Sequence, residues 1–176
     1  MATIPVMSTV SAGGIGTAAL WNSQVRDTGN FFLGVPHVIL AQGTAQTIAT
    51  SAFAALLFDV EIRDNDSVHS TVSNTSRITI VTAGWYEVSG TVGWAGNATG
   101  QRLSHWAVNG TGADSTEISA NATLGTSTGY AACTTSLFLN VGDYLELHIW
   151  QNTGGNLNTN VGATTRSRAA ARWLGQ

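Results

Sequence analysis

From about residue 44 onward, apolar, aromatic and β-branched residues alternate with small polar residues. Successive side chains of a β-strand point to opposite faces, so this period of two is typical of strands with one buried face. Clusters of Gly and Asn interrupt the alternation at intervals, as turns would. The chain also lacks the long helical crossovers that neighbouring parallel strands need. The pattern therefore predicts an all-β sandwich of antiparallel sheets.

Three stretches define the two expected walls of this sandwich. The strand "YEVSGTVGW" should form one wall, and "SLFLNV" and "YLELHI" should form the facing wall. Alternation sends Tyr144 and Trp150 outward, and they are candidate subunit contacts because aromatic residues are enriched in interface cores. The side chains expected to face inward are Tyr86, Val88, Val92, Trp94, Leu145, Leu147 and Ile149.

Residues 1–43 differ in character and form an N-terminal arm with one short helix, whereas residues 44–176 form the β domain. The helical stretch "TAALWNSQVRDTGNFFL" begins at Thr17, a residue type that caps helix N-termini. Gly29 and Asn30 favour a break, and Gly34–Pro36 ends the segment. A single short helix cannot form its own core, so we expect it to dock onto the β domain or onto another subunit.

Composition narrows the classes of function. The 176 residues have a formal net charge of −3, and only 10% of them are charged. The seven basic residues form no cluster, which argues against a nucleic-acid surface. No apolar run approaches the roughly 20 residues of a membrane helix, so we expect no membrane insertion. A weakly charged, polar surface suits a protein that is packed into an assembly.

The sequence contains no convincing catalytic, cofactor or metal site. The stretch Gly13–Ala19 resembles a dinucleotide-binding loop, but no acidic residue ends the next strand and no further βα units follow. Asp64, Asp66 and His69 are the candidates for a hydrolytic site, although neighbouring loop residues more often form a polar turn. We therefore predict a protein that is not an enzyme and has no cofactor or metal.

Several stretches together resemble the C1q/TNF-like jelly-roll family. They are "LFDVEIRDNDSVHSTVSNTSRITIVTAGWYEVSGTVGWAGNATGQR", with its Gly84–Tyr86 strand entry, the segment Asn140–Trp150 with its "GD", and the closing Arg166–Gly175. The resemblance covers roughly residues 45–175 and is nearest to the virion proteins of tailed bacteriophages. It implies a homotrimer of ten-stranded jelly rolls with aromatic strand faces around the threefold axis.

The arm separately resembles the leader of tail proteins from phages of actinobacteria, through Thr17, Ala18, Asn22, Val25, Arg26 and Asp27. Together the resemblances imply a structural virion protein, a trimeric minor tail or tail-tip module that contacts other virion proteins and the host surface. Two alternatives stay open: a trimeric capsid decoration protein, and a carbohydrate-binding, lectin-like module that contacts host glycans. The sequence does not contain a collagen-like stalk or a long coiled coil, so a long fibre is not expected.

Aromatic and large apolar residues are the expected structural determinants. Those expected to anchor the arm are Leu20, Trp21, Val25, Phe31 and Phe32. Those expected to stabilise the sandwich or the trimer axis are Tyr86, Trp94, Tyr144, Trp150 and Trp173.

Overall fold

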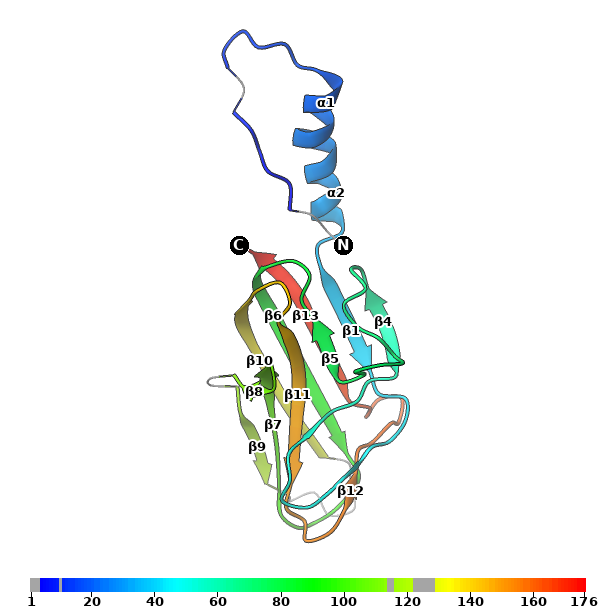
Figure 1. The fold of residues 1–176 in the computed structure, drawn as a ribbon. Helices are drawn as coiled ribbons and strands as arrows, with labels where there is room; N and C mark the ends of the chain where they lie inside the picture. Colours follow the sequence, from blue (N-terminus) through cyan, green and yellow to red (C-terminus); the bar gives the residue numbers. More distant parts are fainter. Residues whose placement is uncertain (1–3, 10, 114–115, 122–128) are drawn as a thin grey trace.

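The computed structural model describes residues 4–9, 11–113, 116–121 and 129–176. Their strands form two facing antiparallel sheets, with a helix projecting from one end of the sandwich (Figure 1). The five-stranded sheet has the order β10 (Gly129–Leu139), β6 (Gly84–Trp94), β13 (Arg168–Gly175), β1 (His37–Ala41) and β4 (Val60–Asp64).

The second sheet is centred on β11 (Tyr144–Gln151) and β7 (Gln101–Val108). Around them lie β3 (Ala54–Ala55), β5 (Arg77–Thr79), β8 (Thr111–Gly112) and β9 (Ile118–Asn121). The short strands β2 (Thr47–Ile48) and β12 (Leu157–Asn158) pair with each other. This arrangement confirms the predicted all-β, antiparallel jelly-roll sandwich.

The core lies between the two sheets, and the inward faces are those that the period of two predicts. Trp94 and Trp106 are fully buried, as are the predicted inward residues of β11, and Tyr86, Val88 and Val92 are buried as well. The sheets approach closely at Gly90, where an added Cβ would come within 2.8 Å of the Leu147 side chain.

One predicted wall is wrong. The stretch "SLFLNV" belongs to β10, which pairs with β6 in the same sheet, with Leu137 opposite Tyr86 and Phe138 opposite Trp85. A period of two determines which side chains of a strand are buried, but it carries no information about the neighbouring strand. The other predicted facing strand, β11, does lie in the opposite sheet.

Strand β1 lies within the range that the sequence pattern gave to the arm. Its residues pair with β13 on one side and with β4 on the other, so the sheet begins at His37. The segment outside the sandwich therefore comprises the residues before this strand.

The helix consists of α1 (Ala18–Trp21), a π-helical turn η1 (Asn22–Arg26) and α2 (Asp27–Leu33). Thr17 is confirmed as its N-cap, because the Thr17 hydroxyl accepts the backbone N–H of Leu20 at 3.1 Å. The predicted break at Gly29 and Asn30 is wrong, since the helix continues to Leu33. Such residues cost up to about 1 kcal/mol each in a helix, and the packing of the adjacent Phe31 against Trp173 offsets this cost.

Candidate functional site

The helix rests on the sandwich through one aromatic side chain and leaves most of its apolar residues uncovered. Phe31 is buried and meets Trp173 of β13 edge-to-face, with 5.1 Å between ring centroids. By contrast, Trp21 is 66% exposed and Phe32 is 70% exposed, and Val25 is exposed too. Of the five predicted anchor residues, the fold itself buries only Phe31 fully, and Leu20 is half-buried.

The segment before the helix runs back alongside it (Figure 1). The Gln24 side chain accepts the backbone N–H of Ser8 at 3.1 Å and donates to the Ser8 hydroxyl at 2.9 Å. The Thr28 hydroxyl lies 3.5 Å from the sulfur of Met7. These contacts brace the helix but leave Trp21 and Val25 at the edge of an apolar hollow, which is lined by Gly16, Thr17, Leu20, Trp21, Gln24 and Val25.

A second uncovered aromatic group lies on the outer face of the five-stranded sheet. Trp85 of β6 and Phe138 of β10 pair across the sheet edge-to-face, with 5.7 Å between ring centroids. They are 47% and 50% exposed. Their outward neighbours on the same two strands are small or polar: Ala132, Thr134, Ser136, Glu87, Ser89 and Thr91. Sequence reasoning missed this pair, although alternation around Tyr86 would have sent Trp85 outward.

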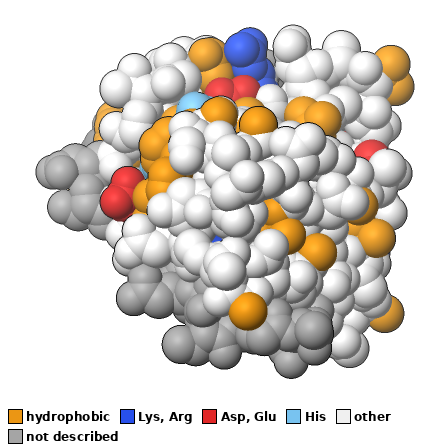
Figure 2. Space-filling model, turned by 90° about the horizontal axis from the view of Figure 1, so that it is seen from below, with side chains coloured by type: hydrophobic (Ala, Val, Ile, Leu, Met, Phe, Trp, Pro, Cys, Tyr) orange, Lys and Arg blue, Asp and Glu red, His pale blue; other side chains and the backbone are white. Residues whose placement is uncertain are grey.

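Low charge also marks the end of the molecule opposite the helix. Figure 2 shows that end, where few side chains are charged and those few lie mostly near the margin. Both this end and the outer face of β6 and β10 therefore expose mainly uncharged groups.

Tyr144 and Trp150 point outward from β11 as predicted, but side chains of the same chain partly cover them. The Arg77 guanidinium lies over the Tyr144 ring, 4.0 Å from its centroid. The Trp150 ring is 6.3 Å from that of Phe53, which also contacts His105 at 4.9 Å. Their role as subunit contacts stays a prediction.

The end of β4 and the loop that joins it to β5 contain the three candidates for a hydrolytic site, and hydrogen bonds hold them there: Asp64, Asp66 and His69. The Asp64 carboxylate accepts the backbone N–H groups of Asp66 and His69 at 3.2 and 3.0 Å. The buried His69 ring contacts Glu61 at 2.9 Å through Nδ1 and the carbonyl of Thr75 at 3.1 Å through Nε2. These bonds shape the loop.

Asp66 also affects the core. It is buried close to the Thr82 hydroxyl, and Tyr86 donates its hydroxyl to the Thr82 carbonyl at 2.7 Å. Burial, together with the nearby Asp66 carboxylate, raises the pKa of Tyr86 well above its usual value. The Tyr86 hydroxyl thus stays protonated and ties the start of β6 to the preceding turn.

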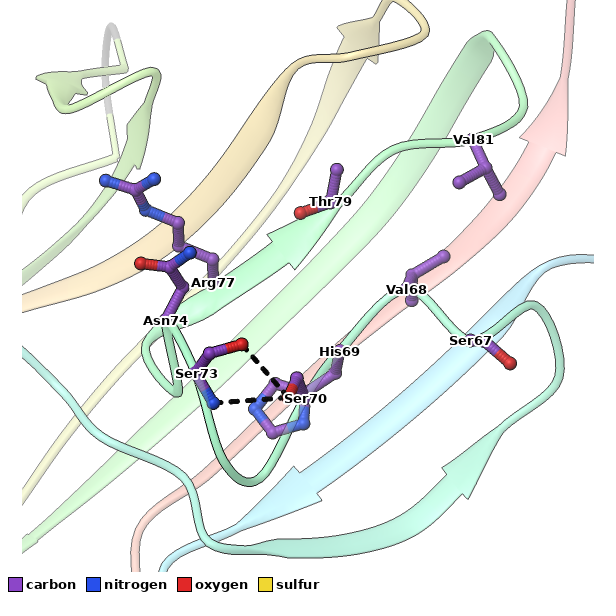
Figure 3. Close-up of a pocket in the computed structure, with 9 residues that line it drawn as sticks. All are labelled: Ser67, Val68, His69, Ser70, Ser73, Asn74, Arg77, Thr79 and Val81. Atoms are coloured by element: carbon purple, nitrogen blue, oxygen red, sulfur yellow. Dashed lines mark hydrogen bonds between the residues drawn. The ribbon is translucent and has the colours of Figure 1, made fainter.

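A polar hollow of about 230 Å³ lies between this loop and β5 (Figure 3). The side chains of Asn74, in the loop, and Arg77, at the start of β5, extend in the same direction; Thr79 ends the strand and Val81 follows it. The residues that line it are Ser67, Val68, His69, Ser70, Ser73, Asn74, Arg77, Thr79 and Val81.

Glu146 of β11 fixes Arg77 beside the hollow. Its Oε1 atom accepts Nε of Arg77 at 3.3 Å and the Ser76 hydroxyl at 2.7 Å, and its Oε2 atom lies 3.3 Å from Nε2 of His148. Burial opposes ionisation of Glu146, but these hydrogen bonds outweigh it and lower the pKa of the carboxyl group. The ionised carboxylate therefore neutralises Arg77 locally.

Among the described residues, no three His, Cys, Asp or Glu side chains gather in the way a metal site requires. In the same part of the chain, no helix is both long enough and apolar enough to cross a membrane.

The chain matches no protein-family model and no curated protein sequence. Its structure is similar to the globular domain of zebrafish complement 1qA protein, with a TM-score of 0.57 and 10% identity, over 79% of this chain and 97% of that one. It is also similar to murine APRIL at pH 8.0, with a TM-score of 0.55 and 11% identity, over 78% of this chain and 98% of that one. At these identities the likeness defines the fold alone, and the fold is a C1q/TNF-like jelly roll.

Proposed function

We propose that this chain is a non-enzymatic structural protein of a tailed bacteriophage virion, a homotrimeric tail module that is attached through its N-terminal helix. The projecting helix is the observation that carries the proposal. Trp21, Val25 and Phe32 are exposed on it, and a helix of this length is marginally stable in water without a packed face. A partner surface that covers these side chains would stabilise it.

The sequence of the helix supports a virion protein as that partner. The residues Thr17, Val25, Arg26 and Asp27 belong to the stretch that resembles the leader of phage tail proteins. This stretch belongs to the projecting helix rather than to the sandwich. A segment with exposed apolar residues at the end of a folded domain is suited to docking into a second protein.

The C1q/TNF-like fold is compatible with a trimeric module. The outer face of β6 and β10 offers a surface for self-association, because it combines the Trp85–Phe138 pair with mostly small, uncharged side chains, Glu87 being the charged residue among them. Aromatic groups and a low content of charge are typical of interface cores. Closed threefold symmetry would use this surface once per subunit without forming open filaments.

Light scattering on the purified chain tests the trimer and the face that forms it. We expect a trimeric mass for the full chain and for a chain that lacks residues 1–34, because β1 begins later, at His37. The double variant Trp85→Ser/Phe138→Ser should give monomers, whereas the control Trp21→Ser should stay trimeric. A monomeric mass for the unaltered chain would refute the trimer.

Antibody labelling of intact particles tests the location. Label at the tail is the expected result, and it should require the helix: particles carrying the chain without residues 1–34 should lose the label. Label on the heads would instead identify a capsid decoration protein.

A further inference from the structure

We infer that the hollow between β5 and the loop after β4 binds an uncharged, polyhydroxylated ring, such as the terminal sugar residue of a glycan. This inference goes beyond the assembly role, because the hollow is complete within one chain and its occupancy does not depend on a trimer.

The loop that forms the hollow is held in place before any ligand arrives. Beyond the Asp64 and His69 contacts, the backbone N–H of Thr79 donates to the Val68 carbonyl at 2.7 Å. The Ser70 hydroxyl accepts the N–H groups of Val72 and Ser73 at 3.3 and 3.2 Å, and lies 3.5 Å from the Ser73 hydroxyl (Figure 3). A site that is ordered in advance loses less conformational entropy when it binds.

The free polar groups of the hollow both donate and accept hydrogen bonds. The Nη atoms of Arg77, the side-chain amide of Asn74 and the hydroxyl of Thr79 have no partner within the described parts of the chain. The Arg77 guanidinium is nevertheless fixed, because Nε is held by Glu146 and Cζ lies over the Tyr144 ring. Vicinal hydroxyl groups of a sugar, each a donor and an acceptor, match this set.

Charge favours a neutral ligand. The nine lining residues include no carboxylate, so a cation would find no opposite charge among them. Arg77 is the positive charge at the rim, but its contact with the Glu146 carboxylate offsets it. An anion would therefore gain little net attraction, whereas hydrogen bonds to neutral hydroxyl groups are available without an uncompensated charge.

Size and position agree with one ring. The volume of about 230 Å³ is smaller than the roughly 300–1,000 Å³ of pockets that enclose drug-sized ligands. Val68 and Val81 supply apolar contacts for the C–H face of a ring. The lining residues come from the flank of the sandwich and none from the helix, so docking through the helix would leave the hollow open.

The test uses the full chain, labelled with ¹⁵N, and methyl pyranosides of glucose, galactose, mannose, rhamnose and N-acetylglucosamine. We expect one of these glycosides to shift the backbone amide resonances of Asn74, Arg77 and Thr79. The shifts should saturate at millimolar concentrations, as a single-ring ligand with few contacts would. Sodium glucuronate should bind no better than methyl glucoside.

Two variants remove hydrogen-bonding groups without disturbing the backbone. Asn74 has a φ of 49°, so Asn74→Gly deletes the amide at a position where glycine is unstrained. Thr79→Val keeps the β-branched shape. Each should weaken binding about fivefold, the effect of one lost hydrogen bond. The matched control Thr134→Val alters an exposed strand residue of the other sheet and should leave affinity unchanged.

Three results would overturn the inference. One is the absence of shifts with every glycoside, and another is a set of shifts that the Asn74 and Thr79 variants leave unaltered. The third is tighter binding of glucuronate than of methyl glucoside, which would assign the hollow to anions. All three results come from ligand titrations and do not depend on the oligomeric state of the chain. They are therefore independent of the test of the trimer.

Discussion

Phe31 and Trp173 join two segments that lie at opposite ends of the sequence, with 5.1 Å between ring centroids at an interplanar angle of 89°. Trp173 is held in turn by its indole N–H, which donates to the Ala83 carbonyl at 3.0 Å. The helix is therefore attached to the closing strand of the sandwich at one aromatic contact.

Replacing Phe31 with Ala should release the helix while the sandwich stays folded. Loss of the ring removes the packing that offsets the helix-unfavourable Gly29 and Asn30, so amide hydrogen exchange should accelerate in residues 18–33 and change little in β6. The matched control is Phe32→Ala, which removes an exposed ring and should alter exchange only slightly. Equal effects of the two substitutions would contradict the assigned contact.

Gly90→Ala should destabilise the sandwich by about 1–3 kcal/mol, the usual cost of overpacking a core. The added methyl group would lie 2.8 Å from Leu147 and 3.3 Å from the Trp106 ring. The free energy of unfolding can be measured by urea denaturation. Gly155→Ala is the control, because an added Cβ there has no neighbour within 4 Å, and its unfolding free energy should match that of the unaltered chain.

Glu146 should make stability dependent on pH in the acidic range. Its folded-state pKa is lowered from the usual 4.5, so the unfolded chain binds its proton more readily. The contribution is therefore fully present above about pH 4.5 and is lost as pH falls through the folded-state pKa. Hydrogen bonds to a charged group are worth roughly 1.5–3 kcal/mol.

The variant Glu146→Gln isolates this contribution. It should be less stable than the unaltered chain at pH 7, and the difference should shrink as the pH falls below 4.5. Unfolding free energies at pH 7, 5 and 3 would measure the change. A difference that stays constant across these pH values would contradict the role given to the carboxylate.

Trp150→Ala compares the two faces that could meet in a trimer. If the outward aromatics of β11 form the contact, this variant should raise the dissociation constant of the trimer more than it lowers the free energy of unfolding of the subunit. If the outer face of β6 and β10 forms the trimer contact, substitutions of Trp85 and Phe138 should raise the dissociation constant instead. Analytical ultracentrifugation over a concentration series separates the two cases.

The sequence correctly predicted the features that depend on one strand alone, namely which of its side chains are buried. Alternation correctly predicted that Leu145 and Leu147 are buried and that Tyr144 points outward. It could not determine that Phe138 lies beside Trp85, because strand pairing depends on contacts between distant parts of the chain. Likewise, local propensity predicted a helix break at Gly29, but a tertiary contact made by Phe31 prevailed.

The polar hollow also depends on contacts between distant parts of the chain, so the sequence did not predict it. Asn74, Arg77 and Thr79 lie close together in the sequence, yet no motif marks them as a site. What assembles the hollow is the path of the loop, together with a carboxylate on β11 that lies about 70 residues away. Asp64 and Asp66, the candidates for a hydrolytic site, do not line the hollow, whereas His69 forms part of its wall.

The scarcity of charge on the outer face of β6 and β10 has a consequence for assembly in different media. Contacts between uncharged surfaces contain almost no screened Coulomb energy, so ionic strength has little effect on them. Subunits joined through Trp85, Phe138 and their mostly uncharged neighbours would change little in affinity between dilute and moderate salt. Such an interface would tolerate a change of surroundings that dissociates complexes held by ion pairs.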